Sequence, residues 1–510
     1  MGLVGSLSEL ATLPAVGGLL CLYFIVQRIV DYVKLRKFGG PWYSGITHLG
    51  HSRHILSPNI HEFYQDVSEK HGPIARIAPG ILVTSSPEVW SHVNRHPGYK
   101  RSDWYYRACR VEYRRDNVFT QTDNAKHEQR RKQMAPGYSG RENLDLEPSI
   151  DDRVNDLLNL IRTKYISTDN EVVPMDLAKK IQYFTLDVIS GVGLGKTFGM
   201  LKKDADVDDY LKSSEEGITA ISYALAFGVS WLVHAPIIGR LVAPSPNDNN
   251  GFGKMIAACF RDVDERTAKD TEKKSDMLAS FIRHGLSGDE LRSEALEQLI
   301  AGSDTTAGAI RGSLLHIIAN PRVYMKLQRE IDEAVRDGLA PALGEGLISL
   351  EQTRKLPYLQ AVIRESLRMR PPVVNTFPRN IPAGGDVINV NGESVYLPEG
   401  ACIGYSAYAM HRSEETYGKD AKTFRPERWF EQDEDKLAAM KSVNDLVFGY
   451  GRFLCLGKPV AQIELAKLIF EMFRNFELAF IDPARPWKIY NTMGLFVISD
   501  MWVQVTERKH

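Results

Sequence analysis

A ten-residue stretch near the C-terminus, residues 448–457 (FGYGRFLCLG), constrains this chain more than any other feature. Its three glycines let the backbone turn tightly and approach something flat, and one cysteine, Cys455, is presented from the loop. Residues 458–473 then show helical periodicity, with Pro459 in the first turn. A cysteine just before a helix N-terminus is favoured as the thiolate, which binds metals. The alternative is a small buried hydrophobic residue, the usual role of a lone cysteine.

The composition is that of a large globular chain. It has 510 residues, 43% hydrophobic and 25% charged, which excludes disorder and collagen-like repeats. Its 63 basic and 64 acidic residues give a net charge of −1, so no global field attracts nucleic acid and any basic surface is a local patch. The five cysteines are far apart and form no CxxC pattern, which argues against a disulfide framework and fits a reducing compartment.

An apolar run at the N-terminus, residues 10–26, predicts a membrane anchor. It is uncharged over about seventeen residues, near the lower limit for a spanning helix. Basic residues follow the run, which favours an uncleaved anchor with the downstream chain in the cytosol: Arg28, Lys34, Arg36 and Lys37. The alternative is a buried core helix. We therefore expect an anchor over residues 1–37 and a catalytic domain over residues 38–510, joined by a hinge at 38–42 (FGGPW).

The periodicity of the remaining chain predicts a mainly helical fold with small sheets. Helix-period stretches cover residues 154–164, 176–191, 291–319, 321–336 and 358–369. Strand-like runs are few: residues 77–84, 387–396 and 495–505.

The helix expected at 291–319 has an unusual middle. Residues 287–290 fit an S-x-x-E capping box, yet residues 301–308 (AGSDTTAG) include several poor helix formers. One explanation is close packing of a neighbouring element against small residues, with hydroxyls bonding back to carbonyls. The other is a local break that frees polar groups for a ligand.

A pair of charged residues three apart, Glu365 and Arg368, lies on the helix that ends before Pro371. Alone, such a pair is usually a surface ion pair of small energetic value. Residues 424–429 (FRPERW) follow downstream.

In their order along the chain, these stretches resemble the motifs of the cytochromes P-450, the haem-thiolate monooxygenases. The cysteine loop is similar to Phe-x-x-Gly-x-Arg-x-Cys-x-Gly, with Phe453 standing where the family has arginine. Residues 301–306 match the family's oxygen-site motif completely, and Glu-x-x-Arg lies between the two motifs as in the family. The resemblance implies a helix-rich triangular prism with small sheets, built around haem b.

The resemblance also implies roles for individual residues. Cys455 is the axial iron ligand, and Phe448, Gly449 and Gly457 shape its haem-binding loop. Thr305 orients and hydrogen-bonds iron-bound dioxygen, while Asp304 relays protons. The remaining assignments are a structural ion triad of Glu365, Arg368 and Arg428, and haem-propionate contacts from His127, Arg131 and Arg379. For His127 and Arg131 the alternative is a solvated basic helix face. The family's arginine two residues before the cysteine is missing here, and Arg452 is an alternative residue for the propionate contact that it makes.

The implied reaction inserts one atom of dioxygen into a small, largely apolar substrate. The chain has no G-x-G-x-x-G nucleotide-binding motif after a strand, so the electrons must come from another protein. The implied donor is the NADPH–cytochrome P450 reductase of the endoplasmic reticulum membrane, docking near Arg452, Lys458 and residues 130–132. A run of sequence after the cysteine loop is similar to filamentous-fungal members that tailor terpenoid, polyketide or alkaloid skeletons.

By analogy with the family, five segments line the substrate pocket: residues 100–119, 210–242, 299–301, 373–377 and 494–496. Two other functions remain open. A haem sensor or carrier needs neither Asp304 nor Thr305, and family members that rearrange substrates without dioxygen tend to lose that pair.

Overall fold

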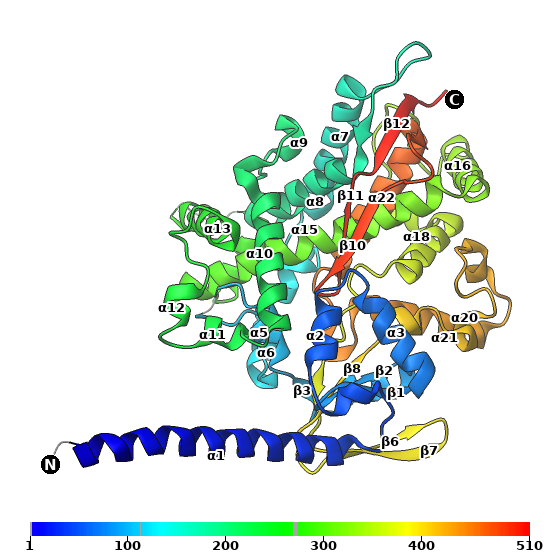
Figure 1. Cartoon of the computed structure of the whole chain (residues 1–510). Coiled ribbons are helices and arrows are strands. Elements are labelled where there is room, and N and C mark those ends of the chain that lie inside the picture. The colour runs from blue at the N-terminus through cyan, green and yellow to red at the C-terminus, as the bar shows by residue number, and fades with distance from the viewer. Residues whose placement is uncertain (1–2, 113, 269–273, 510) are drawn as a thin grey trace.

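The computed structural model describes residues 3–112, 114–268 and 274–509 and is mainly helical, as the sequence predicts (Figure 1). The helices are α1 (Leu3–Leu35), α2 (Leu49–Ile55), α3 (Ile60–His71), α4 (Pro87–Arg95), α5 (Trp104–Cys109), α6 (Asn124–Tyr138), α7 (Leu146–Lys164), α8 (Leu177–Leu194), α9 (Met200–Lys203), α10 (Tyr210–Ala226), α11 (Ser230–His234), α12 (Gly239–Val242), α13 (Gly251–Thr267), α14 (Met277–Arg283), α15 (Gly288–Ile318), α16 (Pro321–Arg336), α17 (Leu350–Arg354), α18 (Pro357–Met369), α19 (Ala407–Met410), α20 (Glu414–Tyr417), α21 (Glu434–Asp445) and α22 (Lys458–Asn475). The strands are β1 (Ile74–Ala78), β2 (Ile81–Thr84), β3 (Lys100–Arg101), β4 (Met175–Asp176), β5 (Arg379–Asn380), β6 (Asp386–Val390), β7 (Glu393–Leu397), β8 (Cys402–Tyr405), β9 (Phe476–Phe480), β10 (Lys488–Thr492), β11 (Leu495–Ser499) and β12 (Trp502–Glu507).

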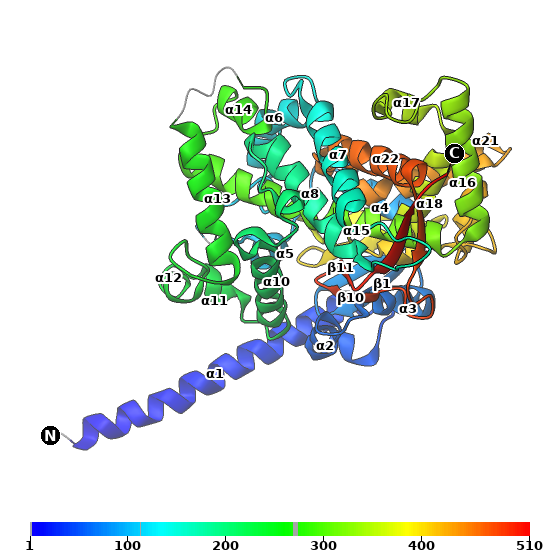
Figure 2. The ribbon, with the colours of Figure 1, turned by 90° about the horizontal axis from the view of Figure 1, so that it is seen from above.

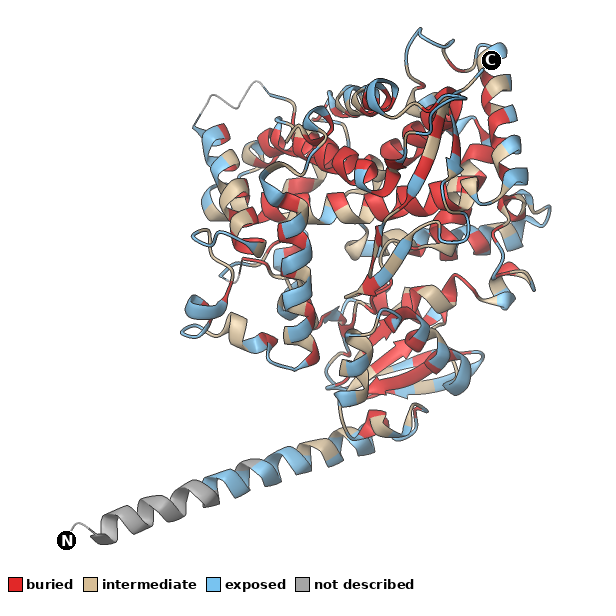
Figure 3. Cartoon of the chain, turned by 45° about the horizontal axis from the view of Figure 1, so that its top comes forward, coloured by how far each residue is buried: buried red, intermediate tan, exposed pale blue. Residues whose placement is uncertain are grey.

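The long helix α15 crosses the centre of the molecule, and α8 packs along it (Figures 1 and 2). Most residues of α8 are buried on every side, which suits a helix with few charges. Buried residues concentrate in these central helices, whereas most of the residues of α1 whose exposure is described are exposed (Figure 3). The core therefore surrounds the two segments that carry the predicted chemistry, α15 and the loop before α22.

Helix boundaries follow the sequence patterns closely where the pattern is strongly amphipathic. The bounds of α16 are those predicted, with Pro321 in its first turn. The predicted capping box before α15 is wrong, because the Ser287 side chain makes no capping hydrogen bond. Asp289 instead accepts from Arg292 at 2.8 Å and pairs with Arg115.

The three strand-like runs are each two strands, which corrects the prediction. Residues 77–84 span β1 and β2, which pair antiparallel across a turn at Gly80 with φ +74°. Residues 387–396 span the hairpin β6–β7. Residues 495–505 span β11 and β12, which belong to different sheets and are separated by Asp500 at φ +52°. A period-2 pattern continues through a tight reversal, so periodicity alone does not reveal the turn.

Four small sheets support the helices. The largest has the strand order β1-β2-β8-β5-β3, in which β5 brings Arg379 opposite Arg101 of β3. The others are β4-β12-β9, the hairpin β10–β11 and the hairpin β6–β7. The first sheet thus places two arginines that are distant in sequence side by side.

The N-terminal helix α1 extends away from the body of the molecule (Figures 1 and 2). Among the described residues, Val16–Leu35 is a 20-residue stretch long and apolar enough to cross a membrane, and none of its apolar window is buried. The alternative of a buried core helix is therefore wrong. Leu35, at the end of the helix, is fully buried and joins α1 to the core.

Candidate functional site

The cysteine loop turns sharply because two of its glycines, Gly449 and Gly451, occupy the left-handed region that other residues rarely adopt. Gly449 has φ +80°, and a Cβ there would lie 2.7 Å from the carbonyl oxygen of Phe453. The Cys455 amide donates to the Phe448 carbonyl at 2.7 Å, which closes the loop. Gly457 is the residue before α22, and a Cβ there would lie 3.7 Å from the Cys455 sulfur. The loop therefore holds the thiol at the N-terminus of α22.

The Cys455 side chain is exposed, and the other residues of the loop are exposed or partly buried. The enclosing protein raises the pKa of the thiol by desolvation, and the Gly457 amide, the Arg131 guanidinium and the Lys458 amide oppose that shift. The surroundings thus supply partners for a thiolate without fully compensating its charge. A bound metal cation would complete the compensation.

The predicted oxygen-site residues lie in the middle of α15, which continues through them without a break. Ala301 is exposed, although the helix runs through the core. The Thr305 hydroxyl donates to the Ala301 carbonyl at 2.8 Å, the back-bonding expected of a threonine inside a helix. Gly302 allows close packing, because a Cβ there would lie 2.7 Å from Cγ1 of Ile189 on α8. The expected close packing is therefore confirmed, whereas the expected local break is not found, because α15 is continuous over Gly288–Ile318. The segment is accessible only through its Ala301 face.

The Asp304 carboxylate contacts α8 and α10 and lines a cavity there. Its carboxylate accepts from the Gln182 amide at 2.7 Å and from the Ser214 hydroxyl at 3.4 Å. Burial raises the pKa of Asp304, and Arg311 together with these hydrogen bonds opposes the shift. A carboxyl with a raised pKa that sits beside a threonine can take up and release protons.

A cavity of about 120 Å³ reaches Asp304 from α8, α10 and the β10–β11 hairpin. Two of the predicted pocket segments contribute to it, through Leu211 and Ser214 and through Leu495 and Phe496. The segments 100–119 and 373–377 instead bring Tyr105 and Phe377 to the arginine cluster described next. Tyr113 of the first of these segments lies outside the described residues.

Three arginines and one histidine converge behind the cysteine loop: Arg101, Arg131, Arg379 and His127. Arg101, Arg379 and His127 are at most 6% exposed. Arg101 donates to the Val118 carbonyl at 2.6 Å, and Arg131 donates to the Leu454 carbonyl at 2.5 Å.

The cluster carries positive charge that its protein neighbours do not neutralise. Among the described residues, the guanidiniums bond to carbonyl oxygens, Tyr105 and Asn94. Nε of Arg101, Nε of Arg379 and Nδ1 of His127 have no partner there. Burial and the adjacent arginines lower the pKa of His127 to about 3, and burial lowers that of Arg101 to about 10. Unpaired buried cations are costly, so these residues fit a group with two carboxylates beside the thiol.

Phe453, which stands where the family has arginine, lies within this cluster. Its ring centre is 4.2 Å from the Arg379 guanidinium carbon and 4.8 Å from that of Arg101. Such stacking partly stabilises buried guanidiniums. Arg452 does not join them, because its Nη1 lies 3.6 Å from a Glu128 carboxylate oxygen.

Arg101 is the site residue that the sequence analysis missed. It lies within a segment expected to line the substrate pocket, and no local pattern distinguishes it from the neighbouring Lys100. Only the pairing of β3 with β5 brings it opposite Arg379.

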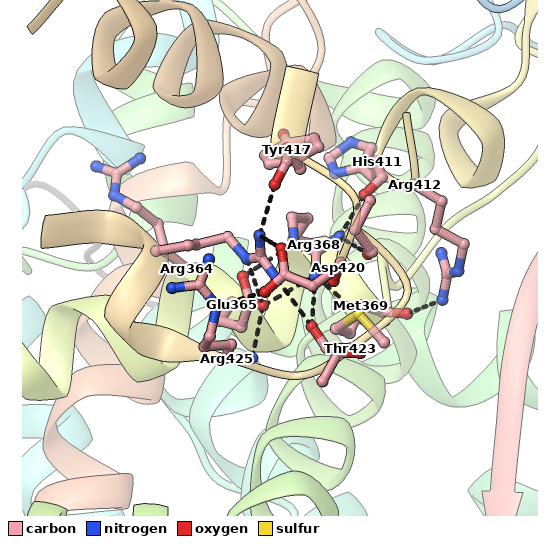
Figure 4. Close-up of polar contacts among 12 residues, drawn as sticks. Arg364, Glu365, Arg368, Met369, His411, Arg412, Tyr417, Asp420, Thr423 and Arg425 are labelled. Carbon is pink, nitrogen blue, oxygen red and sulfur yellow. Dashed lines mark hydrogen bonds and ion pairs between the residues drawn. The ribbon is translucent and has the colours of Figure 1, made fainter. Parts of the chain in front are cut away.

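Glu365, Arg368 and Arg428 form the ion triad that the motif order predicts, and Figure 4 shows Glu365 beside Arg368. Arg368 contacts Glu365 through two hydrogen bonds of 2.9 and 2.8 Å, and Arg428 contacts it at 2.8 Å. The Trp429 indole donates to the same carboxylate at 3.1 Å. All three charged side chains are at most 1% exposed, so removing one member would leave a buried charge unpaired, at a cost of about 3–5 kcal/mol. The triad braces α18 against the 424–429 segment.

Comparison with known proteins agrees with this geometry. The family model described as Cytochrome P450 matches residues 39–503. The chain is 38% identical to the cytochrome P450 monooxygenase ABA1 of Pyricularia oryzae, over 96% of this chain and 95% of the relative. It is 36% identical to the cytochrome P450 monooxygenase aba1 of Botryotinia fuckeliana, over 93% and 92%, and 31% identical to abl1 of Leptosphaeria maculans, over 93% and 84%. The chain belongs to the cytochrome P450 family.

Proposed function

We propose that this P450 monooxygenase oxidises a small, largely apolar organic molecule in a secondary-metabolite pathway of the terpenoid, polyketide or alkaloid type. The observation that carries the proposal is the accessible Cys455 thiol beside three arginines, two of them buried, that have no carboxylate partner among the described residues. This arrangement suits haem b, whose iron takes a thiolate ligand and whose two propionates need cations. Thiolate-ligated haem iron, when bound, supplies the reductive activation of dioxygen.

The residues of this chain have distinct parts in that proposal. Cys455 is the iron ligand, and Arg101, Arg131, Arg379 and His127 hold the propionates. Phe448, Gly449 and Gly457 keep the cysteine loop in its closed turn.

Asp304 and Thr305 manage protons. Release of one oxygen atom as water consumes two protons, which must reach a site that otherwise excludes water. The cavity of about 120 Å³ brings solvent to Asp304, and Gln182 and Ser214 hold its carboxyl in place. Asp304 would pass protons toward Thr305, whose hydroxyl donates to the Ala301 carbonyl in this structure and would hand protons on to the site when haem is bound.

The electrons are proposed to come from the NADPH–cytochrome P450 reductase of the endoplasmic reticulum membrane. In this proposal α1 is the anchor in the same membrane, and residues 38–510 form the catalytic domain. Of the basic residues expected to dock the reductase, Arg130 is committed to Glu290 at 2.9 Å and Glu294 at 2.7 Å, and Arg131 belongs to the arginine cluster. Lys132 is exposed and Lys458 is partly exposed, so these two remain for docking.

The deciding experiment is the carbon monoxide difference spectrum of the reduced protein, recorded beside Cys455→Ser. We expect the Soret band of thiolate-ligated haem in the wild type and its loss in the variant. Cys402→Ser, which replaces a cysteine of β8, is the matched control and should keep the band. A wild type without the band would contradict the proposal.

A second measurement separates turnover from haem carriage. With purified reductase, the wild type should couple NADPH oxidation to oxygenated product, and Thr305→Ala should uncouple the two. If the yield of oxygenated product per NADPH oxidised were unchanged in Thr305→Ala, Thr305 would have no role in proton delivery. A protein that has the Soret band and consumes no NADPH with any organic substrate tested would instead be a sensor or carrier.

A further inference from the structure

An acidic residue, Glu297, lies on the same face of α15 as the proposed oxygen site. It precedes Ala301 by one turn and Thr305 by two turns, and residues four apart lie above one another on a helix. Ala301 is exposed on that face, and Glu297 is half-buried. A carboxyl group therefore lies on the helix face that is exposed at Ala301, next to segment 299–301, which the family resemblance assigns to the substrate pocket.

Only one side of this carboxyl is held by the protein. Asn117, in the segment after α5, donates to Glu297 Oε2 at 2.9 Å. Oε1 has no hydrogen-bond partner and the carboxyl has no ion-pair partner within residues 3–112, 114–268 and 274–509. By contrast, Glu294, one turn earlier, accepts from Arg130 at 2.7 Å and from the Val118 amide at 3.1 Å. Glu294 is thus committed to the fold, while half of Glu297 is free.

The surroundings favour the protonated form of Glu297. Burial, reinforced by the adjacent Glu294, raises the pKa of Glu297 to about 8, and Asn117 and Arg101 oppose the shift only in part. A protonated carboxyl presents a hydroxyl donor, whereas a carboxylate only accepts. The arginine cluster close by also disfavours a second cation in this region.

We propose that Glu297 determines substrate specificity by donating a hydrogen bond from its free oxygen to an oxygen atom of an otherwise apolar substrate. This inference rests on the proposed function and names the substrate class more closely: apolar molecules that carry a hydroxyl, carbonyl or carboxyl oxygen. A site built to hydrogen-bond such a group discriminates against the analogue that lacks it, because the buried partner is then left unsatisfied.

The test compares three probes of one shape: tetralin, 2-tetralol and the trimethyl-2-tetralylammonium ion. Their dissociation constants are measured by equilibrium dialysis against the haem-loaded full chain. We expect the ratio of the tetralin constant to the tetralol constant to fall about tenfold in Glu297→Leu. Glu297→Gln keeps an amide donor of similar shape, so its ratio should stay within about threefold of the wild type. The control Glu290→Leu removes an exposed carboxyl of the same helix and should leave the ratio unchanged.

Two results would overturn the inference. The first is a ratio of the tetralin to the tetralol dissociation constant that is the same in Glu297→Leu as in the wild type. Failure of both neutral probes to bind counts as the same result. The second is tight binding of the ammonium probe that is lost in Glu297→Gln, which would make Glu297 a site for cations. The carbon monoxide spectrum of each variant is recorded in parallel. A missing Soret band in the wild type counts against the proposed function, whereas an intact band with an unchanged ratio counts against Glu297 alone.

Discussion

At the residue scale, the replacement of the usual loop arginine by Phe453 is explained by what surrounds the ring. Arg101 and Arg379 stack on it from β3 and β5, and the His127 ring centre lies 5.3 Å away. The positive charge that the family places within the loop is here supplied by neighbouring strands. Under the proposed haem site, Arg101 would compensate for the missing arginine.

This assignment predicts different effects for two substitutions. Arg101→Leu should accelerate transfer of haem to an apomyoglobin acceptor by tenfold or more, because a buried anion loses a guanidinium partner. Phe453→Arg should not slow the transfer, because the anion site already has its cations. Arg107→Leu, which removes an exposed partner of Asp103, is the control and should match the wild type. Slower transfer from Phe453→Arg would show that the site lacks a charge.

At the element scale, α15 combines two requirements in one segment. Its small residues admit α8 closely at Gly302, and its Ala301 face stays exposed for a ligand. A helix interior with glycine loses stability through backbone entropy, so its glycines need a packing reason. Gly302 has such a reason and Gly308 does not, because a Cβ at 308 would meet only the Phe496 carbonyl oxygen at 3.7 Å.

The same substitution at these two positions should therefore have opposite effects on stability. Gly308→Ala should raise the free energy of unfolding by up to about 1 kcal/mol through helix propensity. Gly302→Ala should lower it by about 1–2 kcal/mol, because overpacking against Ile189 outweighs that gain. Chemical denaturation of both variants measures the difference. Equal changes in the free energy of unfolding of the two variants would mean that α8 accommodates the extra methyl group at position 302 without loss of stability.

At the scale of the whole molecule, several buried histidines make the fold sensitive to acid. Burial and neighbouring arginines lower the pKa of His316 and of His411 to about 3, and of His61 to about 4. Both ring nitrogens of His411 lack a hydrogen-bond partner among the described residues. These side chains are neutral in the folded protein and become protonated on unfolding below about pH 6.5.

Stability should therefore fall as the pH drops from about 6.5 toward 3, because the unfolded chain binds more protons than the folded chain. Each such histidine contributes a slope of about 1.4 kcal/mol per pH unit in that window. Denaturant unfolding of the full chain between pH 7.5 and 5 measures the slope. His411→Leu should reduce it by about one proton, while His71→Gln, at an exposed position, should not. An unchanged slope in His411→Leu would show that His411 titrates normally.

Much of the fold and part of the site could be predicted from sequence alone. Helix α16 and the apolar helix α1 follow from patterns that extend over several turns. The cysteine loop follows from glycines whose conformation other residues cannot adopt, and the triad from the order of two motifs. The hairpins within 77–84 and 387–396 could not be distinguished from single strands, because alternation continues through their turns.

The sequence by itself determined the local chemistry of this protein: the glycine loop that presents Cys455, the small and polar residues inside α15, and an apolar helix able to cross a membrane. Only the tertiary structure decided which charges work together. It turned Arg130 toward Glu294, brought Arg101 to Arg379, and left one oxygen of Glu297 without a hydrogen-bond partner in the part of the chain that the structure describes. The physical reason is range. Backbone conformation and periodicity are set within a few residues, whereas the burial and pairing of a charge depend on residues that are distant along the chain.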